Sequence, residues 1–199
     1  DRSVSRGLGD VYKRQHESIL VLWKDDKVFN KDLVREPYSE TFLKNSAGKT
    51  RKGTPSRFGS GKETIYNAHK KGALPRDVIK IPALAGGAGS VERVFFCKTC
   101  KSLKSGSKEK KPCVDGGCEL VIHPTQKPME LSLKLINSCK QDDGLVFVPF
   151  AGTGSECLAA LELGLPYLGV ELNSDYVKLI NARLKNFTKD GIQTKLKTT

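Results

Sequence analysis

The sequence predicts an α/β fold of the Rossmann-like class, and three features of its last third predict it. Two short apolar runs, at residues 145–148 (LVFV) and 167–171 (YLGVE), have the composition of buried strands. A glycine-containing turn at residues 149–154 (PFAGTG) follows the first run, and apolar residues at helical spacing follow each strand. The order strand, helix, strand, helix is half of a doubly wound parallel sheet.

The two helices of this half have recognisable ends. The first runs from about residue 155 to 163 and is closed by Gly164, because glycine adopts the left-handed conformation that ends many helices. The second begins at about residue 175, behind Ser174 as its cap. Its apolar residues recur at helical spacing: Val177, Ile180, Leu184 and Phe187. Residues 188–199 are polar and are predicted to fray as a tail.

One further helix and one further strand are predicted upstream. Pro128 suits the first position of a helix. The apolar residues after it share one helical face: Leu131, Leu135, Ile136 and Cys139. Residues 18–23 (SILVLW) form an unbroken apolar run, which is typical of a strand buried on both faces of a sheet. We therefore assign residues 16–24 to a core strand, and Trp23 and Phe147 to the core.

Residues 25–122 have a different composition. Basic residues multiply, glycine and serine recur and apolar runs shorten, which predicts exposed loops with short strands. Residues 1–15 show neither helical nor strand periodicity and join abruptly to the apolar run after them. We predict that they are a non-native or disordered end with no role.

Charge and cysteine content limit the class of protein. The 199 residues carry a formal net charge of +12, which favours a polyanionic partner such as nucleic acid and opposes an acidic one. No run approaches the about 18 apolar residues of a membrane span, and residues 1–15 lack the apolar block of a signal peptide. Six cysteines without an export signal indicate a reducing compartment. We expect a cytoplasmic protein without membrane contact, whose clustered cysteines bind metal.

The glycine turn and the acidic residue after it predict a binding site for an adenosyl group. Gly152 and Gly154 let the backbone approach a ligand closely and leave free N–H groups at a helix start. Glu171 ends the next strand, 19 residues after Gly152, where a carboxylate can accept hydrogen bonds from both ribose hydroxyls. A dinucleotide-binding turn would require a third glycine at Cys157, and a phosphate-binding loop would require a lysine that is absent here.

Together these motifs resemble one protein family. Residues 123–136 (HPTQKPMELSLKLI), 144–177 (GLVFVPFAGTGSECLAALELGLPYLGVELNSDYV) and 181–184 (NARL) are similar to the carboxyl-terminal half of the amino-group DNA methyltransferases of the permuted beta type. Residues 16–24 (HESILVLWK) are similar to the strand that precedes the target-recognition region in that family. The resemblance covers residues 16–187.

The resemblance implies a fold, an activity and partners. The fold is a class I S-adenosylmethionine-dependent methyltransferase fold, with residues 25–122 as target-recognition region and residues 123–187 as the cofactor-binding part of the core. The activity is methylation of adenine N6 or cytosine N4. The substrate is double-stranded DNA with a flipped target base. The protein is expected in the cytoplasm and comes from a bacterium or a phage. A cognate restriction endonuclease is its expected partner protein.

The resemblance also implies roles for individual residues. Thr125 and Lys127 would contact the methionine end of the cofactor, and Glu171 would hold its ribose. The adenosyl side would be lined by residues of the glycine turn: Pro149, Phe150, Gly152 and Gly154. Val148 departs from the family pattern, which has aspartate before Pro-Phe, and we expect the departure to weaken cofactor affinity without abolishing it.

The family carries its chemistry on an Asp/Asn/Ser-Pro-Pro-aromatic tetrapeptide, and this sequence has no Pro-Pro pair. We therefore expect a fragment, truncated at its amino end and with an incomplete fold, that is inactive or nearly so by itself. Two alternatives stay open. The first alternative to a DNA methyltransferase fragment is a non-catalytic, zinc-containing DNA-binding module that retains a degenerate cofactor fold. The second is a methyltransferase that acts on RNA or protein.

Residues 44–71 are strongly basic, with aromatic residues interleaved, which suits contacts to phosphates and occasional stacking on bases. Alone, such a segment is more often a solvated loop. Its place between the two methyltransferase segments favours DNA binding, for which the candidate residues are Lys49, Arg51, Lys52, Arg57 and Lys62.

Four cysteines form two close pairs within residues 97–118. Cys97 and Cys100 are separated by two residues, Cys113 and Cys118 by four. Two such pairs across a loop can wrap one tetrahedral Zn²⁺ as a zinc ribbon, and the alternative is four unligated thiols.

Overall fold

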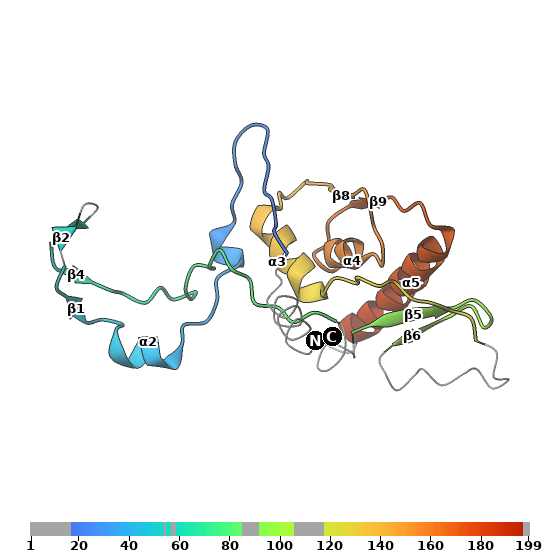
Figure 1. Ribbon diagram of the computed structural model, residues 1–199, viewed down its shortest axis with the longest axis horizontal. Helices are drawn as coiled ribbons and strands as arrows, with labels where there is room; N and C mark the ends of the chain where they lie inside the picture. Colours follow the sequence, from blue (N-terminus) through green and yellow to red (C-terminus); the bar gives the residue numbers. More distant parts are fainter. Residues whose placement is uncertain (1–16, 54, 57–58, 85–91, 106–117, 197–199) are drawn as a thin grey trace, which may run out of the picture.

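The computed structural model of the chain describes residues 17–53, 55–56, 59–84, 92–105 and 118–196. These residues form a helical body, an antiparallel hairpin sheet beside it, and a long arm, residues 38–73, that projects away from both (Figure 1). The predicted non-native or disordered end at residues 1–15 lies outside the described residues.

The body contains the predicted alternation of strands and helices. Strand β8 (Val146–Val148) pairs in parallel with β9 (Tyr167–Gly169), with Phe147 opposite Leu168. Helix α4 (Ser155–Glu162) connects the strands, α3 (Met129–Cys139) packs against α4, and α5 (Ser174–Leu196) follows β9. The α/β prediction is confirmed for this half of the chain.

Helix α5 differs from the prediction at both ends. Asn173, and not Ser174, caps it, because the Asn173 side-chain oxygen accepts the backbone N–H groups of Asp175 and Tyr176 at 2.9 and 3.4 Å. The helix continues to Leu196 through the stretch that the sequence predicts to fray. A helix that is already nucleated extends at little cost through polar residues.

One face of the β8–β9 sheet is packed. Val148 of β8 joins Ala151, Cys157 of α4 and Ile180 of α5 in a buried cluster. Gly169 of β9 lets α4 approach, since a Cβ at that position would lie 2.8 Å from the Cys157 sulfur. This packing fixes the turn between β8 and α4.

The opposite face of the same sheet is exposed in the part of the chain that the structure describes. Phe147 and its partner Leu168 are 58% and 51% exposed. The prediction that Phe147 belongs to the core is therefore wrong for this chain. Parallel sheets are normally covered on both faces. This face carries apolar residues typical of a protein interior, but in the described part of the chain it has no covering layer.

The predicted core strand at residues 16–24 is also wrong. Residues 17–24 form neither helix nor strand, and the apolar side chains of residues 19–23 are exposed, Trp23 at 58%. A strand forms only beside a neighbour that accepts its hydrogen bonds, and no described strand pairs with this segment. Glu17 forms an ion pair with Lys127, just before α3, and after the segment the Asn30 backbone N–H donates to the Ser138 carbonyl of α3.

The arm contains small elements only. They are α2 (Glu40–Asn45), the pair β1 (Thr50–Arg51) and β4 (Thr64–Ile65), and the pair β2 (Pro55–Ser56) and β3 (Gly59–Ser60), after a short helix η1 (Lys31–Leu33). Backbone hydrogen bonds between Glu36 and Ala73 close its base. These elements fit the predicted loops with short strands.

A three-stranded antiparallel sheet packs against the body. Its strands are β5 (Val94–Cys97), β6 (Ser102–Ser105) and β7 (Leu120–Val121), in the order β6-β5-β7. Val94, Phe96 and Val121 form one buried cluster with Leu179 of α5. Helix α5 therefore packs against this sheet on one side and, through Ile180, against the β8–α4 turn on the other.

Candidate cofactor-binding site

The glycine turn, residues 149–154, connects β8 to α4 in a conformation that requires glycine. Gly152 and Gly154 have φ of 55° and 73°, in the left-handed region. A Cβ at Gly152 would lie 3.0 Å from His123 Nε2, and one at Gly154 would lie 2.9 Å from Ile180 Cγ2. Gly154 is also the N-cap of α4, and no side chain caps that helix end. The two glycines therefore let the turn pack closely against His123 and Ile180, at the N-terminus of α4.

Glu171 lies directly against this turn, as the sequence predicts. Its Oε2 accepts the Gly152 backbone N–H at 2.8 Å, and its Oε1 accepts the Asn173 N–H at 2.9 Å. The Asn173 N–H, with that of Gly152, holds the pKa of the Glu171 carboxyl below its usual value. The carboxylate is therefore fixed and ionised at neutral pH, and its remaining lone pairs can accept hydroxyl groups.

Two exposed apolar residues lie close in the chain to the turn and to Glu171. Phe150 is 90% exposed, and Leu172, directly after Glu171, is fully exposed. Large apolar residues so exposed beside a polar group suit a planar apolar ligand. Sequence analysis identified Phe150 but missed Leu172, although a large apolar residue between the end of a strand and a helix cap was a usable signal. Pro149, also predicted to line the site, is exposed beside Phe150.

The HPTQKP segment reaches the same turn through His123. Its ring lies against Gly152 and contacts the ring of Tyr176 in a tilted arrangement, with 4.7 Å between the ring centroids. Partial burial lowers the pKa of His123, although the negative charge of Glu171 opposes this shift. The ring is therefore mainly neutral at pH 7.

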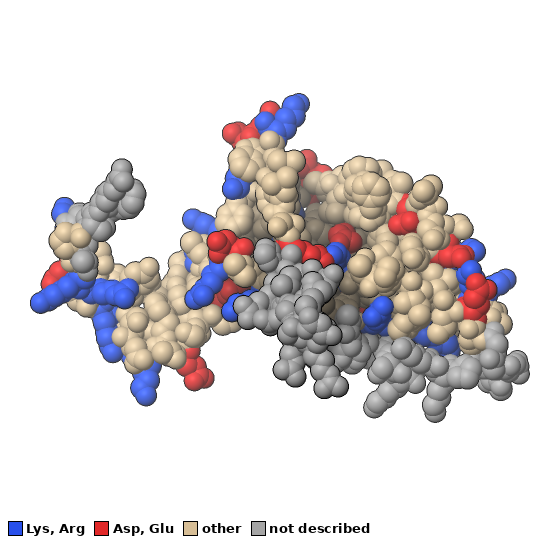
Figure 2. Space-filling model, in the orientation of Figure 1, with Lys and Arg blue, Asp and Glu red and all other residues tan. Residues whose placement is uncertain are grey.

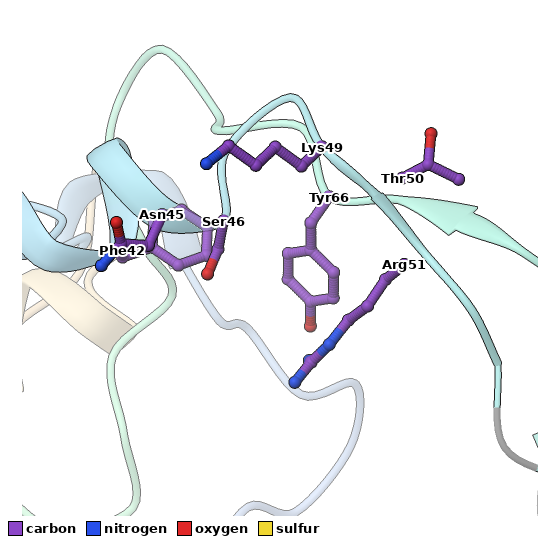
Figure 3. Close-up of a pocket in the computed structure, with 7 residues that line it drawn as sticks. All are labelled: Phe42, Asn45, Ser46, Lys49, Thr50, Arg51 and Tyr66. Atoms are coloured by element: carbon purple, nitrogen blue, oxygen red, sulfur yellow. The ribbon is translucent and has the colours of Figure 1, made fainter.

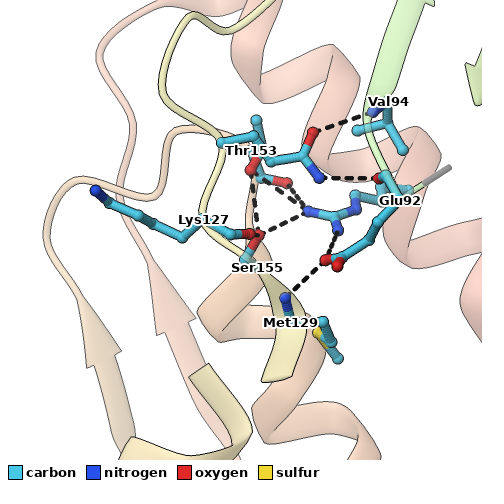
Figure 4. A network of polar contacts seen from close by, with 8 residues as sticks. Glu92, Val94, Lys127, Met129, Thr153 and Ser155 are labelled. Atoms are coloured by element: carbon cyan, nitrogen blue, oxygen red, sulfur yellow. Dashed lines mark hydrogen bonds and ion pairs between the residues drawn. The ribbon is translucent and has the colours of Figure 1, made fainter. Parts of the chain in front are cut away.

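The two cofactor contacts predicted in this segment lie less directly at the turn. Thr125 is exposed, and its N–H donates to His123 Nδ1 at 3.3 Å. The Lys127 ammonium pairs with Glu17, while the Lys127 carbonyl accepts the Ser155 hydroxyl at 2.8 Å. The segment therefore contacts the turn through His123 and through backbone, and the Lys127 side chain points away from it (Figure 4).

Val148 is buried, at 7% exposure, in the cluster beneath the turn. Its side chain packs against apolar groups, and its carbonyl accepts the Val170 N–H at 2.8 Å. An aspartate here would place a carboxylate among apolar side chains, which is costly without a partner. The effect of this residue on cofactor affinity stays a prediction.

The arm carries a concave site with a volume of about 360 Å³ (Figure 3). Its lining residues are Phe42, Asn45, Ser46, Lys49, Thr50, Arg51 and Tyr66. In Figure 3 the Tyr66 ring and the Arg51 side chain extend in the same direction, opposite Phe42.

Three aromatic rings support this site. The rings of Tyr38 and Phe42 stack at 4.7 Å, and the ring of Tyr66 meets Phe42 edge-on at 6.1 Å. Figure 2 shows Lys and Arg gathered on the arm. The structure places Lys49 and Arg51 in the site and Lys52 and Lys62 exposed nearby on the arm, while Arg57 lies outside the described residues.

The cysteines lie at the end of the hairpin sheet. Cys97 ends β5 and is buried, and its sulfur accepts the Cys100 N–H at 3.5 Å. Cys118 precedes β7, whose Leu120 pairs with Cys97. Cys113 lies outside the described residues, and no three His, Cys, Asp or Glu side chains within the described ranges are arranged to hold a metal ion. The zinc ribbon is not supported and stays a prediction.

Within the described residues, no helix combines the length and the apolar character needed to span a bilayer. The expectation of no membrane contact concerns the whole chain and is not decided by this observation.

A glycine turn between a parallel strand and a helix, with a fixed carboxylate at the end of the neighbouring strand, defines an α/β protein suited to a nucleoside-containing ligand. A family model described as DNA methylase, for N6 and N4 methyltransferases, matches residues 2–182. The chain belongs to this family.

Individual relatives match more locally. YubD of Escherichia coli (strain K12) is 44% identical over 62 residues, which are 31% of this chain and 27% of YubD. Type II methyltransferase M.ScaI of Streptomyces caespitosus is 26% identical over 154 residues, 76% of this chain and 41% of that protein. Type II methyltransferase M1.MboII of Moraxella bovis is 25% identical over 145 residues, 62% of this chain and 54% of that protein.

The chain thus spans about half or less of the length of these relatives. The solved structure of the M1.HpyAVI-SAM complex is 28% identical, covering 41% of this chain and 47% of that one, with a TM-score of 0.31.

Proposed function

We propose that this chain is the cofactor-binding and target-recognition part of an S-adenosylmethionine-dependent DNA methyltransferase that modifies an exocyclic amine, adenine N6 or cytosine N4. The observation that carries the proposal is the hydrogen bond from the Gly152 N–H to the Glu171 carboxylate, which places an ionised acceptor against the glycine turn at the start of α4. Membership of the DNA methylase family supports it.

The described residues fit this cofactor. The Glu171 carboxylate would accept the ribose hydroxyls, and Phe150 and Leu172 would lie against the adenine, whose planar ring matches two exposed apolar side chains. Neutral His123 and the backbone of the HPTQKP segment would close the methionine side. When bound there, the cofactor would supply an activated methyl group on its sulfonium, and these residues would hold its ribose, adenine and methionine ends.

We further propose that the acceptor side of the reaction comes from polypeptide outside these 199 residues. The sequence has no Pro-Pro pair with which to build the family's catalytic tetrapeptide. The exposed apolar face at Phe147 and Leu168 is consistent with a missing layer of the fold. Positioning of the amine supplies much of the rate in such a transfer, so this chain alone should transfer almost no methyl groups.

The arm is proposed to bind the DNA. Its described part carries more basic than acidic residues: Lys44, Lys49, Arg51, Lys52, Lys62, Lys70 and Lys71 against Glu40 and Glu63. Lys49 and Arg51 stand beside the exposed ring of Tyr66, a combination that suits a phosphate together with a stacked base.

A zinc site at the hairpin sheet is a separate proposal. Its support is local: the Cys97–Cys100 turn directs a backbone N–H to a sulfur, and Cys118 is brought near the same end of the sheet by β7. Reduced, chelator-washed protein loaded with Co²⁺ should show thiolate charge-transfer bands that Cys97→Ser removes. Absence of these bands in the unaltered chain would contradict zinc binding.

Calorimetric titration with S-adenosylmethionine tests the cofactor site. We expect saturable binding with one site per chain, weakened at least about tenfold in Glu171→Ala, because a carboxylate hydrogen-bonding ribose contributes about 1.5–3 kcal/mol. Glu162→Ala is the matched control, since Glu162 is an exposed carboxylate at the end of α4. No binding by a chain whose circular dichroism shows it folded would refute the proposal and favour a non-catalytic DNA-binding module.

Substrate class is tested on the arm. The double variant Lys49→Ala/Arg51→Ala should lose affinity for duplex DNA and show a shallower dependence of that affinity on salt, because each phosphate contact contributes to the slope. Lys140→Ala, which removes a basic residue at the end of α3, serves as control. Equal or tighter binding of RNA by the unaltered chain would contradict DNA as the substrate.

A further inference from the structure

Arg183 is a buried charged residue next to the glycine turn, and the function proposed above assigns it no role. It lies on α5 and is 8% exposed. Its Nη1 donates to the Thr153 carbonyl at 3.1 Å, to Thr153 Oγ1 at 3.4 Å and to Ser155 Oγ at 3.0 Å (Figure 4). Thr153 stands between the two left-handed glycines. The guanidinium thus holds the backbone between two residues in the left-handed conformation.

The same charge is connected to the recognition region. Nη2 of Arg183 lies 3.8 Å from Oε1 of Glu92, two residues before β5. That oxygen also accepts the Met129 N–H, the first of α3, at 2.6 Å. One carboxylate therefore connects the N-terminus of α3 to the guanidinium that holds the turn.

Gln126 of the HPTQKP segment completes the network. Its side-chain amide donates to the Glu92 carbonyl at 3.0 Å, and its oxygen accepts the Val94 N–H at 3.0 Å. Gln126 thereby pairs with the start of β5 as a neighbouring strand would. Ser155, which receives a hydrogen bond from Arg183, donates in turn to the Lys127 carbonyl at 2.8 Å. Both segments of the cofactor site are held by one polar network.

Burying a guanidinium is unfavourable unless its donors are used. Burial lowers the pKa of Arg183, and the negative charge of Glu92 opposes that shift; arginine nevertheless stays protonated. A leucine or methionine at this place would fill the space between α5 and the turn at lower desolvation cost. The charge is useful because it offers several fixed donors to a turn whose own backbone bonds are few.

We propose that Arg183 is a positioning residue for the cofactor site, which holds Thr153 and Ser155 in the ligand-binding shape, and that Glu92 orients it from the recognition region. This inference rests on the proposed cofactor site. It assigns to the start of β5 a part in cofactor binding, although β5 belongs to the region expected to contact DNA.

Calorimetry with S-adenosylmethionine on three variants tests the proposal. Arg183→Met should bind the cofactor about 10- to 100-fold more weakly, the range expected when a charged hydrogen-bond donor is removed from a buried site. Arg183→Lys should recover only part of the loss, because lysine keeps the charge but not the forked geometry. Glu92→Gln should lose less, since glutamine still accepts the Met129 N–H.

A control separates positioning from general destabilisation. Val121→Ala removes apolar contacts from the cluster between β7 and α5 without touching the turn. It should lower the urea midpoint and leave the cofactor affinity of the folded chain within about twofold, because affinity is a property of the native state. Arg183→Met should instead lose affinity in buffer where circular dichroism shows it folded.

The outcomes are distinguishable from a failure of the proposed function. If the unaltered chain binds no cofactor, the proposed function fails first. If it binds, and Arg183→Met binds equally well, the positioning role is refuted. The same holds if Val121→Ala and Arg183→Met lose affinity alike. If Arg183→Met does not fold, Arg183→Lys and Glu92→Gln decide, and unchanged affinity in both overturns the inference.

Discussion

Substituting alanine for Gly154 tests whether the glycine turn has the tight geometry on which the cofactor site depends. Gly154 has φ of 73°, and a Cβ there would lie 2.9 Å from Ile180 Cγ2 and 3.3 Å from Cγ1. The left-handed conformation costs a residue with a Cβ about 1–2 kcal/mol. Overpacking against a buried side chain costs about 1–3 kcal/mol more. We expect the free energy of unfolding to fall by about 2–5 kcal/mol.

Gly164→Ala is the matched control. Gly164 has φ of 70°, but a Cβ there would meet nothing within 4 Å. This variant should therefore show the conformational cost alone, about 1–2 kcal/mol. The difference between the two variants measures the contact with Ile180.

Urea unfolding followed by far-ultraviolet circular dichroism gives both values, and Ile180→Leu completes the cycle. Leucine keeps the volume but lacks the Cγ2 methyl branch. The loss of unfolding free energy in the double variant should therefore be about 1 kcal/mol smaller than the sum of the losses in the two single variants. If Gly154→Ala is no less stable than Gly164→Ala, Ile180 yields freely and the turn is not tightly packed.

Three single contacts give further predictions. Partial burial lowers the pKa of His123 in the folded chain, so as the pH falls the unfolded chain takes up the His123 proton at a higher pH than the folded chain does. The free energy of unfolding should therefore decrease as the pH falls below about 6.5. If the free energy of unfolding of His123→Gln depends on pH as steeply as that of the unaltered chain, this prediction is wrong. Asn173→Ala should destabilise the chain by about 0.5–2 kcal/mol in urea melts, whereas Ser174→Ala should have little effect, and the reverse order would restore Ser174 as the cap. Phe147→Thr should reduce the fluorescence of a dye that binds apolar surface, and equal dye binding would mean that the β8–β9 face is not its site.

Local patterns were sufficient to predict the cofactor half of the fold. The strands at β8 and β9, the helices after them and the closeness of Glu171 to Gly152 depend on periodicity and turn chemistry within about thirty consecutive residues. These signals are contained in the sequence itself. The structure places Glu171 and both glycines together as expected.

Features that depend on distant partners could not be predicted. The apolar run at residues 18–23 is typical of a buried strand, yet a strand also needs a neighbour, which no local pattern supplies. Arg183 looks like an ordinary polar residue of a helix, because its partners Thr153 and Glu92 are 30 and 91 positions away in the sequence.

Nuclear magnetic resonance of the chain labelled with ¹⁵N-glycine tests the central claim most directly. On addition of S-adenosylmethionine, the amide signals of Gly152 and Gly154 should shift, since both lie in the turn beside Glu171, while those of Gly48 in the arm and Gly164 after α4 should stay unchanged. Signals of Gly152 and Gly154 that do not move at saturating cofactor, or shifts confined to other glycines, would contradict a cofactor site at this turn.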